Sequence, residues 1–136
     1  MRHCKKFNHL GRSCGERNGL LKCLTQSLIL HKRVFTTLAK AKSLKKFAEK
    51  IITKSKDDSM QSRRTVFSYI GHKTVVKELF DNIAKSISTR NGGYTRIIKM
   101  SHRNGDNAAM CMLELVDFNN TYKKIPDSNS THTGRH

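Results

Sequence analysis

The chain of 136 residues carries 27 lysines and arginines against 10 acidic residues, a formal net charge of +17. This length is typical of one domain, and 36% hydrophobic residues suffice for a modest core only. No stretch approaches the roughly 20 apolar residues of a membrane-spanning helix, and no apolar segment of a secretory signal follows the basic N-terminus, so we expect a cytoplasmic protein.

The positive charge is concentrated in the first 64 residues, which hold 17 of the 27 cations but only four acids. Like charges at this density repel one another, so the asymmetry indicates a polyanionic partner. Nucleic acid is the most common partner of this kind, because neutralised phosphates release their counterions.

Residues 1–17 mix cations with Gly, Ser and Asn and show no apolar period. We expect a basic arm that is poorly ordered in water, because it cannot bury enough apolar surface to offset the entropy of ordering. Phe7 and Leu10 fit two roles, which the sequence leaves open: they anchor the arm to its partner or pack against the body.

The four cysteines are expected to be free thiols, with Cys111 a small buried hydrophobe. A zinc site is an alternative for the arm, where His3, Cys4, His9 and Cys14 have suitable ligand atoms. Their spacing is irregular and no second ligand pair follows, so we expect no metal.

Leucines at three- and four-residue steps predict a helix over residues 18–30, and the β-branched and aromatic residues of 33–37 predict a strand. A second helix is predicted over 38–56. Its polar face repeats lysine every fourth residue, at Lys42, Lys46, Lys50 and Lys54. A lysine stripe is usually a solvated face, but only Glu49 is near enough to relieve the repulsion, which favours a surface that faces phosphate.

Two further helices are predicted over residues 59–70 and 73–88, separated by Gly71. In the first, Val66, Phe67 and Ile70 are expected to face the core, with Arg63 and Arg64 outward.

The segment 90–93 ends the last helix through its glycines, and strands are predicted over 94–100 and 108–118. A turn-rich connection joins these strands, and the polar residues 119–136 predict a mobile tail.

This order of elements favours a two-layer α/β fold of the α+β type. We expect a small three-stranded mixed sheet with helices on one face. The chain is thus divided into a basic RNA-binding N-terminal arm (1–17), a globular domain (18–118) and a polar tail (119–136).

Several short strings follow one another in a specific order. They are Met1-Arg2-His3, Leu10-Gly11-Arg12, Ser27-Leu28-Ile29, Thr36-Thr37-Leu38-Ala39-Lys40-Ala41-Lys42, Asp58-Ser59, Arg63-Arg64, Gly92-Gly93-Tyr94-Thr95-Arg96-Ile97, Arg103-Asn104-Gly105-Asp106-Asn107-Ala108 and Glu114-Leu115-Val116-Asp117. Together they resemble the bacterial large-subunit ribosomal protein family L-seventeen, over residues 1 to about 118. The chain departs from the usual pattern of this family at Cys4, Phe7, Asn8, Glu16 and Cys23, and these departures remove cations from the arm.

The resemblance implies a two-layer α/β fold and a structural role in the large ribosomal subunit. It implies binding to large-subunit ribosomal RNA near the polypeptide exit side, with the N-terminus buried in RNA and one copy per ribosome. Neighbouring large-subunit ribosomal proteins would be the protein partners, with the L-thirty-two protein as a candidate. No cofactor, DNA or membrane is implied.

No constellation of catalytic residues is evident. Asp57 and Asp58 lie at a helix junction, where capping is the expected role, and the acids are too dispersed for a two-metal nuclease. Gly92 and Gly93 lack the following lysine and hydroxyl residue of a phosphate-binding loop. We therefore predict that the chain is not an enzyme.

Three basic surfaces are predicted to bind ribosomal RNA, mainly through its folded shape, its backbone and its 2′-hydroxyls. The arm contributes Arg2, His3, Lys5, Lys6, Arg12 and Arg17. A lateral patch contributes Lys42, Lys46, Lys50, Arg63 and Arg64. The β-connection contributes Tyr94, Arg96, Lys99, His102 and Arg103. Tyr94 fits either a stack on a base or ordinary strand packing, and both remain open.

Two rival functions belong to other classes. A nucleic-acid-processing enzyme is disfavoured by the small number of acids. A DNA-binding or nucleoid protein would use the helices at 59–70 and 73–88 as a helix-turn-helix. The second of these helices offers mainly Lys77 and Lys85 beside Glu78 and Asp81, which makes it a poor reader of the major groove.

Overall fold

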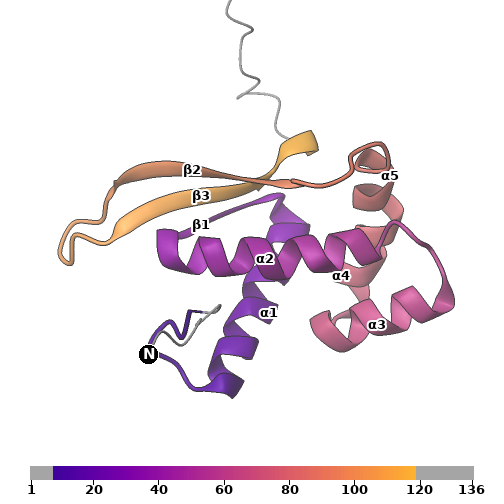
Figure 1. Ribbon diagram of the computed structural model, residues 1–136, viewed down its shortest axis with the longest axis horizontal. Helices are drawn as coiled ribbons and strands as arrows, with labels where there is room; N and C mark the ends of the chain where they lie inside the picture. Colours follow the sequence, from indigo (N-terminus) through magenta and orange to yellow (C-terminus); the bar gives the residue numbers. More distant parts are fainter. Residues whose placement is uncertain (1–7, 119–136) are drawn as a thin grey trace, which may run out of the picture.

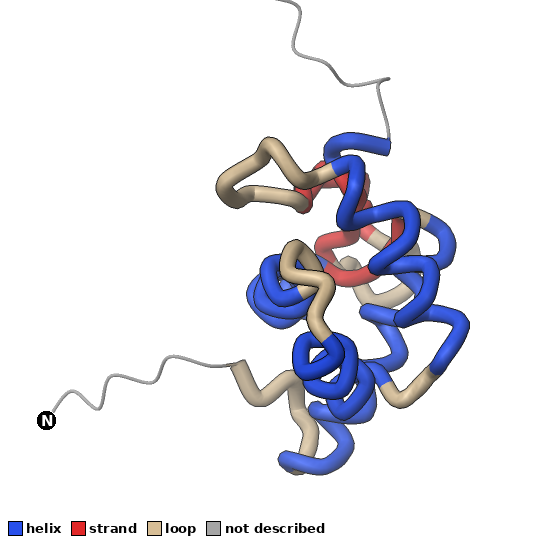
Figure 2. Tube along the Cα trace, turned by 90° about the vertical axis from the view of Figure 1, so that its right-hand side faces the viewer, coloured by secondary structure: helices blue, strands red, loops and turns tan. Residues whose placement is uncertain are grey.

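The computed structural model describes residues 8–118, in which the main helices gather on one side of a three-stranded sheet (Figures 1 and 2). Helix α1 (Cys14–His31) opens with a capping box. The Ser13 hydroxyl accepts a hydrogen bond from the Glu16 backbone N–H at 3.4 Å, and the Glu16 carboxylate accepts one from the Ser13 N–H at 3.0 Å. The predicted start at residue 18 is therefore four residues too late, and Arg17 belongs to the helix.

The sheet consists of β1 (Arg33–Thr37), β2 (Thr95–His102) and β3 (Ala109–Leu115), in the order β1-β3-β2. Both pairings are antiparallel, so the prediction of a mixed sheet is wrong in this detail. The physical reason is the position of β3. The strands β1 and β2 run in the same direction, but the hairpin partner of β2 lies between them, and no parallel pair comes into contact.

The remaining helices follow the predicted segments closely. Helix α2 (Leu38–Lys54) follows β1 directly, and α3 (Met60–Ile70) is capped by Ser59, whose hydroxyl accepts a hydrogen bond from the Ser62 N–H at 3.1 Å. The predicted helix over 73–88 consists of α4 (Lys73–Glu78), a π-helical turn η1 (Leu79–Ile83) and α5 (Ala84–Ser86). A short 3₁₀ turn, η2 (Val116–Phe118), follows β3.

Gly71 separates α3 from α4 in a left-handed conformation with φ 68°. A Cβ atom at this position would lie 2.4 Å from Nζ of Lys22, which reaches across from α1. Glycine is favoured here by the left-handed backbone conformation, whereas the Lys22 side chain could move aside for a methyl group.

The core lies between the helices and the inner face of the sheet. Its buried side chains include Leu28, Leu44, Ile51, Ile70, Leu79, Ile83 and Leu113. The prediction that Phe67 faces the core is wrong, because its side chain is 41% exposed. Helix α3 faces the core through Ser62, Val66 and Ile70, which follow one another at steps of four residues. Phe67 is rotated by about 100° from Val66 around the helix axis and therefore points away from the core.

No helix of residues 8–118 covers the other face of the sheet (Figure 1). The cross-strand register places Arg33, Glu114 and Arg96 in one row and Phe35, Met112 and Ile98 in the next. Phe35 is 58% exposed, whereas Glu114 is 1% exposed. The β2–β3 hairpin extends beyond the helical layer, so its tip has solvent on both faces (Figure 1).

Candidate nucleic-acid interface

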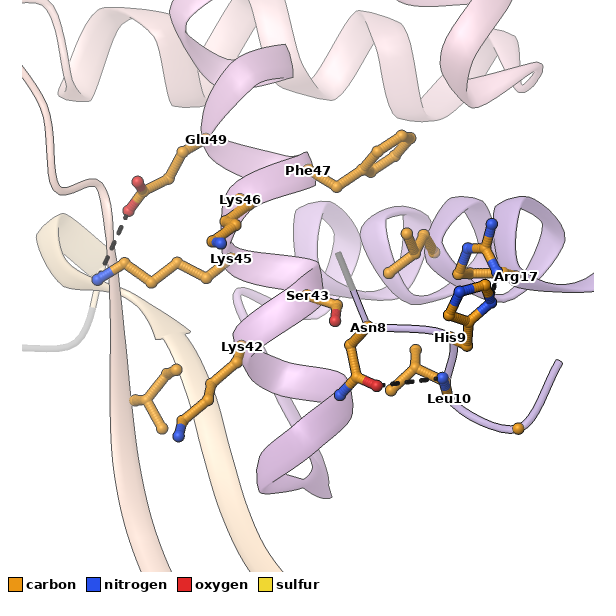
Figure 3. A pocket seen from close by; sticks show the side chains of 13 residues that line it. Asn8, His9, Leu10, Arg17, Lys42, Ser43, Lys45, Lys46, Phe47 and Glu49 are labelled. Atoms are coloured by element: carbon orange, nitrogen blue, oxygen red, sulfur yellow. Dashed lines mark hydrogen bonds and ion pairs between the residues drawn. The ribbon is translucent and has the colours of Figure 1, made fainter. Parts of the chain in front are cut away.

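A groove of about 1070 Å³, which we call the N-terminal groove, is lined by the turn before α1, by α1 and α2, and by Ile97 of β2 (Figure 3). On the side of α1 lie Asn8, His9, Leu10 and Arg17, and Phe47 points the same way. On the opposite side of α2, toward the sheet, extend Lys42, Lys45 and Glu49. We call the side toward α1 the apolar side, because Leu10, Leu21 and Phe47 line it, although Asn8, His9 and Arg17 line it too. Lys42 and Lys45 lie on the other side, which we call the cationic side and which also holds Glu49.

The turn before α1 is shaped by two successive residues in the left-handed region, Leu10 with φ 56° and Gly11 with φ 64°. Two predicted RNA-binding arginines stabilise this turn from within. Arg12 donates from Nη1 to the Leu10 carbonyl at 3.1 Å, and Arg17 donates from Nη1 to the Arg12 carbonyl at 3.4 Å. Both side chains are half-buried and stabilise the turn that forms one wall of the groove, and Arg17 also lines the groove.

The lysine row of α2 is exposed along its length, as the helical spacing predicts. No carboxylate among residues 8–118 pairs with Lys42, Lys46 or Lys50; Nζ of Lys50 lies 5.6 Å from the centroid of the Tyr69 ring. Glu49 has other partners, because its carboxylate lies 3.9 Å from Lys45 and accepts a hydrogen bond from the Thr95 hydroxyl at 2.8 Å. Carboxylates of the described residues therefore do not neutralise Lys42, Lys46 or Lys50.

Arg63 and Arg64 line a different groove from Lys42 and Lys46, so the predicted lateral patch is divided. This second groove, of about 560 Å³, lies between α3 and α4 and has Met60, Phe67 and Val76 among its lining residues. Arg64 is exposed there. Arg63 is held by the protein itself.

The guanidinium of Arg63 has three contacts within the domain. It donates from Nη2 to the Asp58 carboxylate at 2.9 Å, lies 4.6 Å from the centroid of the Phe80 ring and 4.0 Å from Asp81. The hydrogen bond from Arg63 lowers the pKa of Asp58, and the same contact raises the pKa of Arg63. Binding of a phosphate by Arg63 would compete with two carboxylates.

The third predicted surface separates into buried and exposed parts. Tyr94 is 2% exposed and packs in the core, with Nζ of Lys56 at 5.3 Å from its ring centroid, so a base cannot stack on it in this fold. Arg96 donates from Nε to Oε1 of the buried Glu114 at 3.0 Å. Lys99, His102 and Arg103 are exposed on the projecting hairpin.

Arg103 is paired locally at the tip of the hairpin. Its Nε donates to Oδ1 of Asp106 at 3.0 Å, and the Ala108 N–H donates to the same carboxylate at 3.2 Å. These hydrogen bonds, first that from Arg103, lower the pKa of Asp106 to about 2. An RNA phosphate would therefore have to compete with Asp106 for the guanidinium of Arg103.

Arg2, His3, Lys5 and Lys6 lie outside the described residues, as do Cys4, Phe7 and the tail. Within residues 8–118, no three His, Cys, Asp or Glu side chains are placed to hold a metal ion, and none of the helices there is long and apolar enough to cross a membrane. Cys14 and Cys23 are exposed free thiols. Cys111 is fully buried, as predicted, and burial raises its pKa.

Among the basic residues of the two grooves, His9, Lys45, Lys73 and Lys77 were not predicted as RNA-binding residues. His9 and Lys45 line the N-terminal groove, and Lys73 and Lys77 line the second groove. Lys73 and Lys77 are four residues apart on the helix after Gly71, a spacing that signals a common face. Their position opposite Arg63 depends on the α3–α4 corner, which the spacing does not describe.

Comparison with known proteins identifies relatives along the whole described region. The family model described as "Ribosomal protein L17" matches residues 20–116. The large ribosomal subunit protein bL17 of Amoebophilus asiaticus is 56% identical over 131 residues, which cover 96% of this chain and 68% of that protein. The proteins of the same name from Porphyromonas gingivalis and Bacteroides fragilis are 52% and 55% identical, each over 99% of this chain and 84% of the relative.

These matches extend across the helices and strands that form both grooves, and they confirm the resemblance read from the short strings of the sequence. The chain belongs to the ribosomal protein L17 family.

Proposed function

We propose that this chain is a structural constituent of the large ribosomal subunit that binds and stabilises folded large-subunit ribosomal RNA. The relatives are named as proteins of that subunit, and the family is structural, so the prediction that the chain is not an enzyme is confirmed. The observation that carries RNA binding is the lysine row of α2, which has no carboxylate partner within residues 8–118 and borders a groove.

The lysine row fits RNA better than it fits solvent. Like charges four residues apart on a helix destabilise it by a few tenths of a kcal/mol per pair, and this cost persists unless a polyanion neutralises them. Phosphate neutralisation also releases counterions, which makes affinity depend on salt. The row and the N-terminal groove thus form one continuous surface for an RNA backbone.

Replacement of Lys42 and Lys46 by alanine tests this role. Each lost phosphate contact lowers the slope of log Kobs against log salt by about 0.7–0.9, so the double variant should lose about 1.5 units when it binds large-subunit RNA. Lys85→Ala is the control, because Lys85 is exposed, lies outside the lysine row and lines neither groove. If the double variant has the same slope as the Lys85→Ala variant, the lysine row does not contact phosphate.

The N-terminal arm is proposed as the principal anchor of the chain on the RNA. A deletion that tests this role has to spare the capping box of α1, so that the helix still forms. Deletion of residues 2–12 leaves Ser13 and Glu16 in place, whereas deletion of 2–17 also removes the first turn of α1. We expect the shorter deletion to keep the body folded by circular dichroism and to reduce co-sedimentation with large subunits strongly. Undiminished co-sedimentation would reject the arm as the anchor.

The position near the polypeptide exit side, the single copy per ribosome and contact with the L-thirty-two protein are proposed on the basis of the family resemblance. Quantitative mass spectrometry of purified large subunits should give one copy per particle. Cross-linking of the same particles should join the chain to the L-thirty-two protein. Cross-links only to proteins remote from the exit side would contradict the placement.

A further inference from the structure

The N-terminal groove joins two chemically different surfaces across α2. Successive residues of a helix are rotated by about 100°, so Lys46 lies between Lys42 on one side and the Ser43 and Phe47 side chains on the other. The cationic row is therefore the border of the apolar side, within the same groove.

We propose that this groove holds a single unstacked nucleotide of the RNA, with its base between the N-terminal turn and Phe47 and its flanking phosphates on Lys42 and Lys46. This inference rests on the proposed function, since it names which part of an RNA the groove receives.

The apolar side has the surfaces that an extruded base needs. Leu10 of the N-terminal turn, Leu21 of α1 and Phe47 of α2 come from three separate segments and line the same groove. Each is only half-buried, although Leu21 and Phe47 also pack against the core. Bases that leave the stack are bound in proteins mainly on apolar and aromatic side chains.

The apolar side is held in shape before any ligand arrives. The Phe47 ring meets the Tyr69 ring edge to face, with centroids 6.2 Å apart and planes at 87°. The Leu10 N–H donates to Oδ1 of Asn8 at 3.3 Å, which fixes the opposite wall. A preformed surface lowers the ordering cost of binding.

The cationic side fits phosphates on either side of one nucleotide. Lys42 and Lys46 are separated by about 6 Å along the helix axis and are both exposed. Glu49 lies one turn beyond Lys45 and 3.9 Å from its Nζ in the same groove, so Lys45 already has a carboxylate partner. The backbone of the RNA is thus directed toward Lys42 and Lys46.

An unpaired RNA segment suits the groove better than a duplex or an acidic protein segment. A duplex offers backbone and groove edges but no base face for the apolar side. An acidic protein segment would pair with the lysines. It would not place a flat apolar group between two anions, as a nucleotide does. The volume of about 1070 Å³ exceeds what one base with its ribose and phosphates requires.

Phe47→Leu tests the base contact separately from the phosphate contacts. A stacked base contributes about 5- to 150-fold in affinity, and leucine keeps part of the apolar contact, so we expect binding of large-subunit RNA to weaken by about 5-fold. The salt slope should not change, because no cation is lost. Phe35→Leu is the matched control, since Phe35 is exposed and lines neither groove, and it should bind as the unaltered chain does.

The outcomes separate this inference from the proposed function. Unchanged affinity for Phe47→Leu, together with the lowered slope for the lysine variant, would overturn the nucleotide and keep RNA binding. If the Lys42→Ala, Lys46→Ala variant also keeps the salt slope of the unaltered chain, both the bound nucleotide and RNA binding by the lysine row are rejected.

A photoreactive benzoylphenylalanine at position 47, in full-length chain assembled into large subunits, gives an answer that does not depend on affinity. We expect cross-linking to one nucleotide of the RNA, and the same probe at exposed Phe35 should not reach that nucleotide. Cross-linking of position 47 to a protein would assign the groove to a protein segment, and the nucleotide would be rejected.

Discussion

Arg96→Met should destabilise the folded domain strongly, although Arg96 is predicted from the sequence to bind RNA. The structure gives its guanidinium a partner on the uncovered face of the sheet: Nε lies 3.0 Å from Oε1 of Glu114, whose side chain is 1% exposed. Removal of the arginine leaves a carboxylate in a site that water hardly reaches. Methionine keeps the apolar stem of the side chain, so the loss concerns the charge.

The magnitude follows from the burial of Glu114. Breaking a buried ion pair by removal of one partner costs about 3–5 kcal/mol. Arg33 faces Glu114 from β1 in the cross-strand register and reduces the loss, so we expect about 2–3 kcal/mol. This is a large part of the roughly 5–15 kcal/mol by which domains of this size are stable.

Urea denaturation followed by circular dichroism measures this loss. With a slope of about 1–3 kcal/mol per molar urea, the midpoint should fall by about 1–2 M. Arg103→Met is the control, because the Arg103–Asp106 pair is 52% exposed on both sides and surface pairs contribute at most about 1 kcal/mol. Combination of Arg96→Met with Glu114→Leu should recover most of the loss, since an apolar pair replaces the ions. A single variant with an unshifted midpoint, or a double variant no more stable than the single one, would refute the reasoning.

Three further predictions concern backbone conformation and the hairpin. Gly71→Ala should lower the free energy of unfolding by about 1 kcal/mol, because φ is 68° and alanine is strained in the left-handed region. Chemical denaturation measures this loss, and an unchanged midpoint would contradict the preference for glycine. Lys32 caps α1 at φ 65°, so Lys32→Gly should be more stable than Lys32→Ala by about 1 kcal/mol in the same assay, since both variants lose the side chain and only alanine keeps the strain. An NMR titration should give Asp106 a pKa of about 2. Because the pKa is lowered in the folded state, the stability that the pair with Arg103 contributes is fully present above the ordinary pKa of an aspartate. It is lost as the pH falls through about 2. Asp106→Asn should therefore tighten RNA binding, and an unaltered affinity would mean that Arg103 does not contact phosphate.

Elements with a strong period were predictable from the sequence. The strand at 33–37 is found at those residues, and α2 and α3 begin or end within two residues of the predicted bounds. The start of α1 was missed because its apolar period begins only at Leu20, whereas the helix is opened by the pair of Ser13 and Glu16. A capping box lies at the start of a helix, ahead of the first residues of its apolar repeat. Prediction of the helix start therefore needs both the capping box and the repeat.

The candidate site was predictable only where it lies on one element. The lysine row of α2 follows from helical spacing alone. The N-terminal groove also needs Leu10 beside Phe47, two residues that the folded chain brings together from different segments. The ion pair of Arg103 with Asp106 joins residues only three positions apart, so the sequence spacing could have predicted it. Burial of Tyr94 depends on the whole core and could not be read from its neighbours.

The central place of β3 in the sheet has a consequence for synthesis of the chain. The strand that joins the other two is the last to be translated, and Cys111 donates from its thiol to the carbonyl of Thr36, 75 residues earlier. Until that strand emerges, β1 has no partner and the uncovered face does not exist. Closure of the sheet therefore waits for the C-terminal part of the domain, and the helices of the N-terminal half can form only local contacts before then.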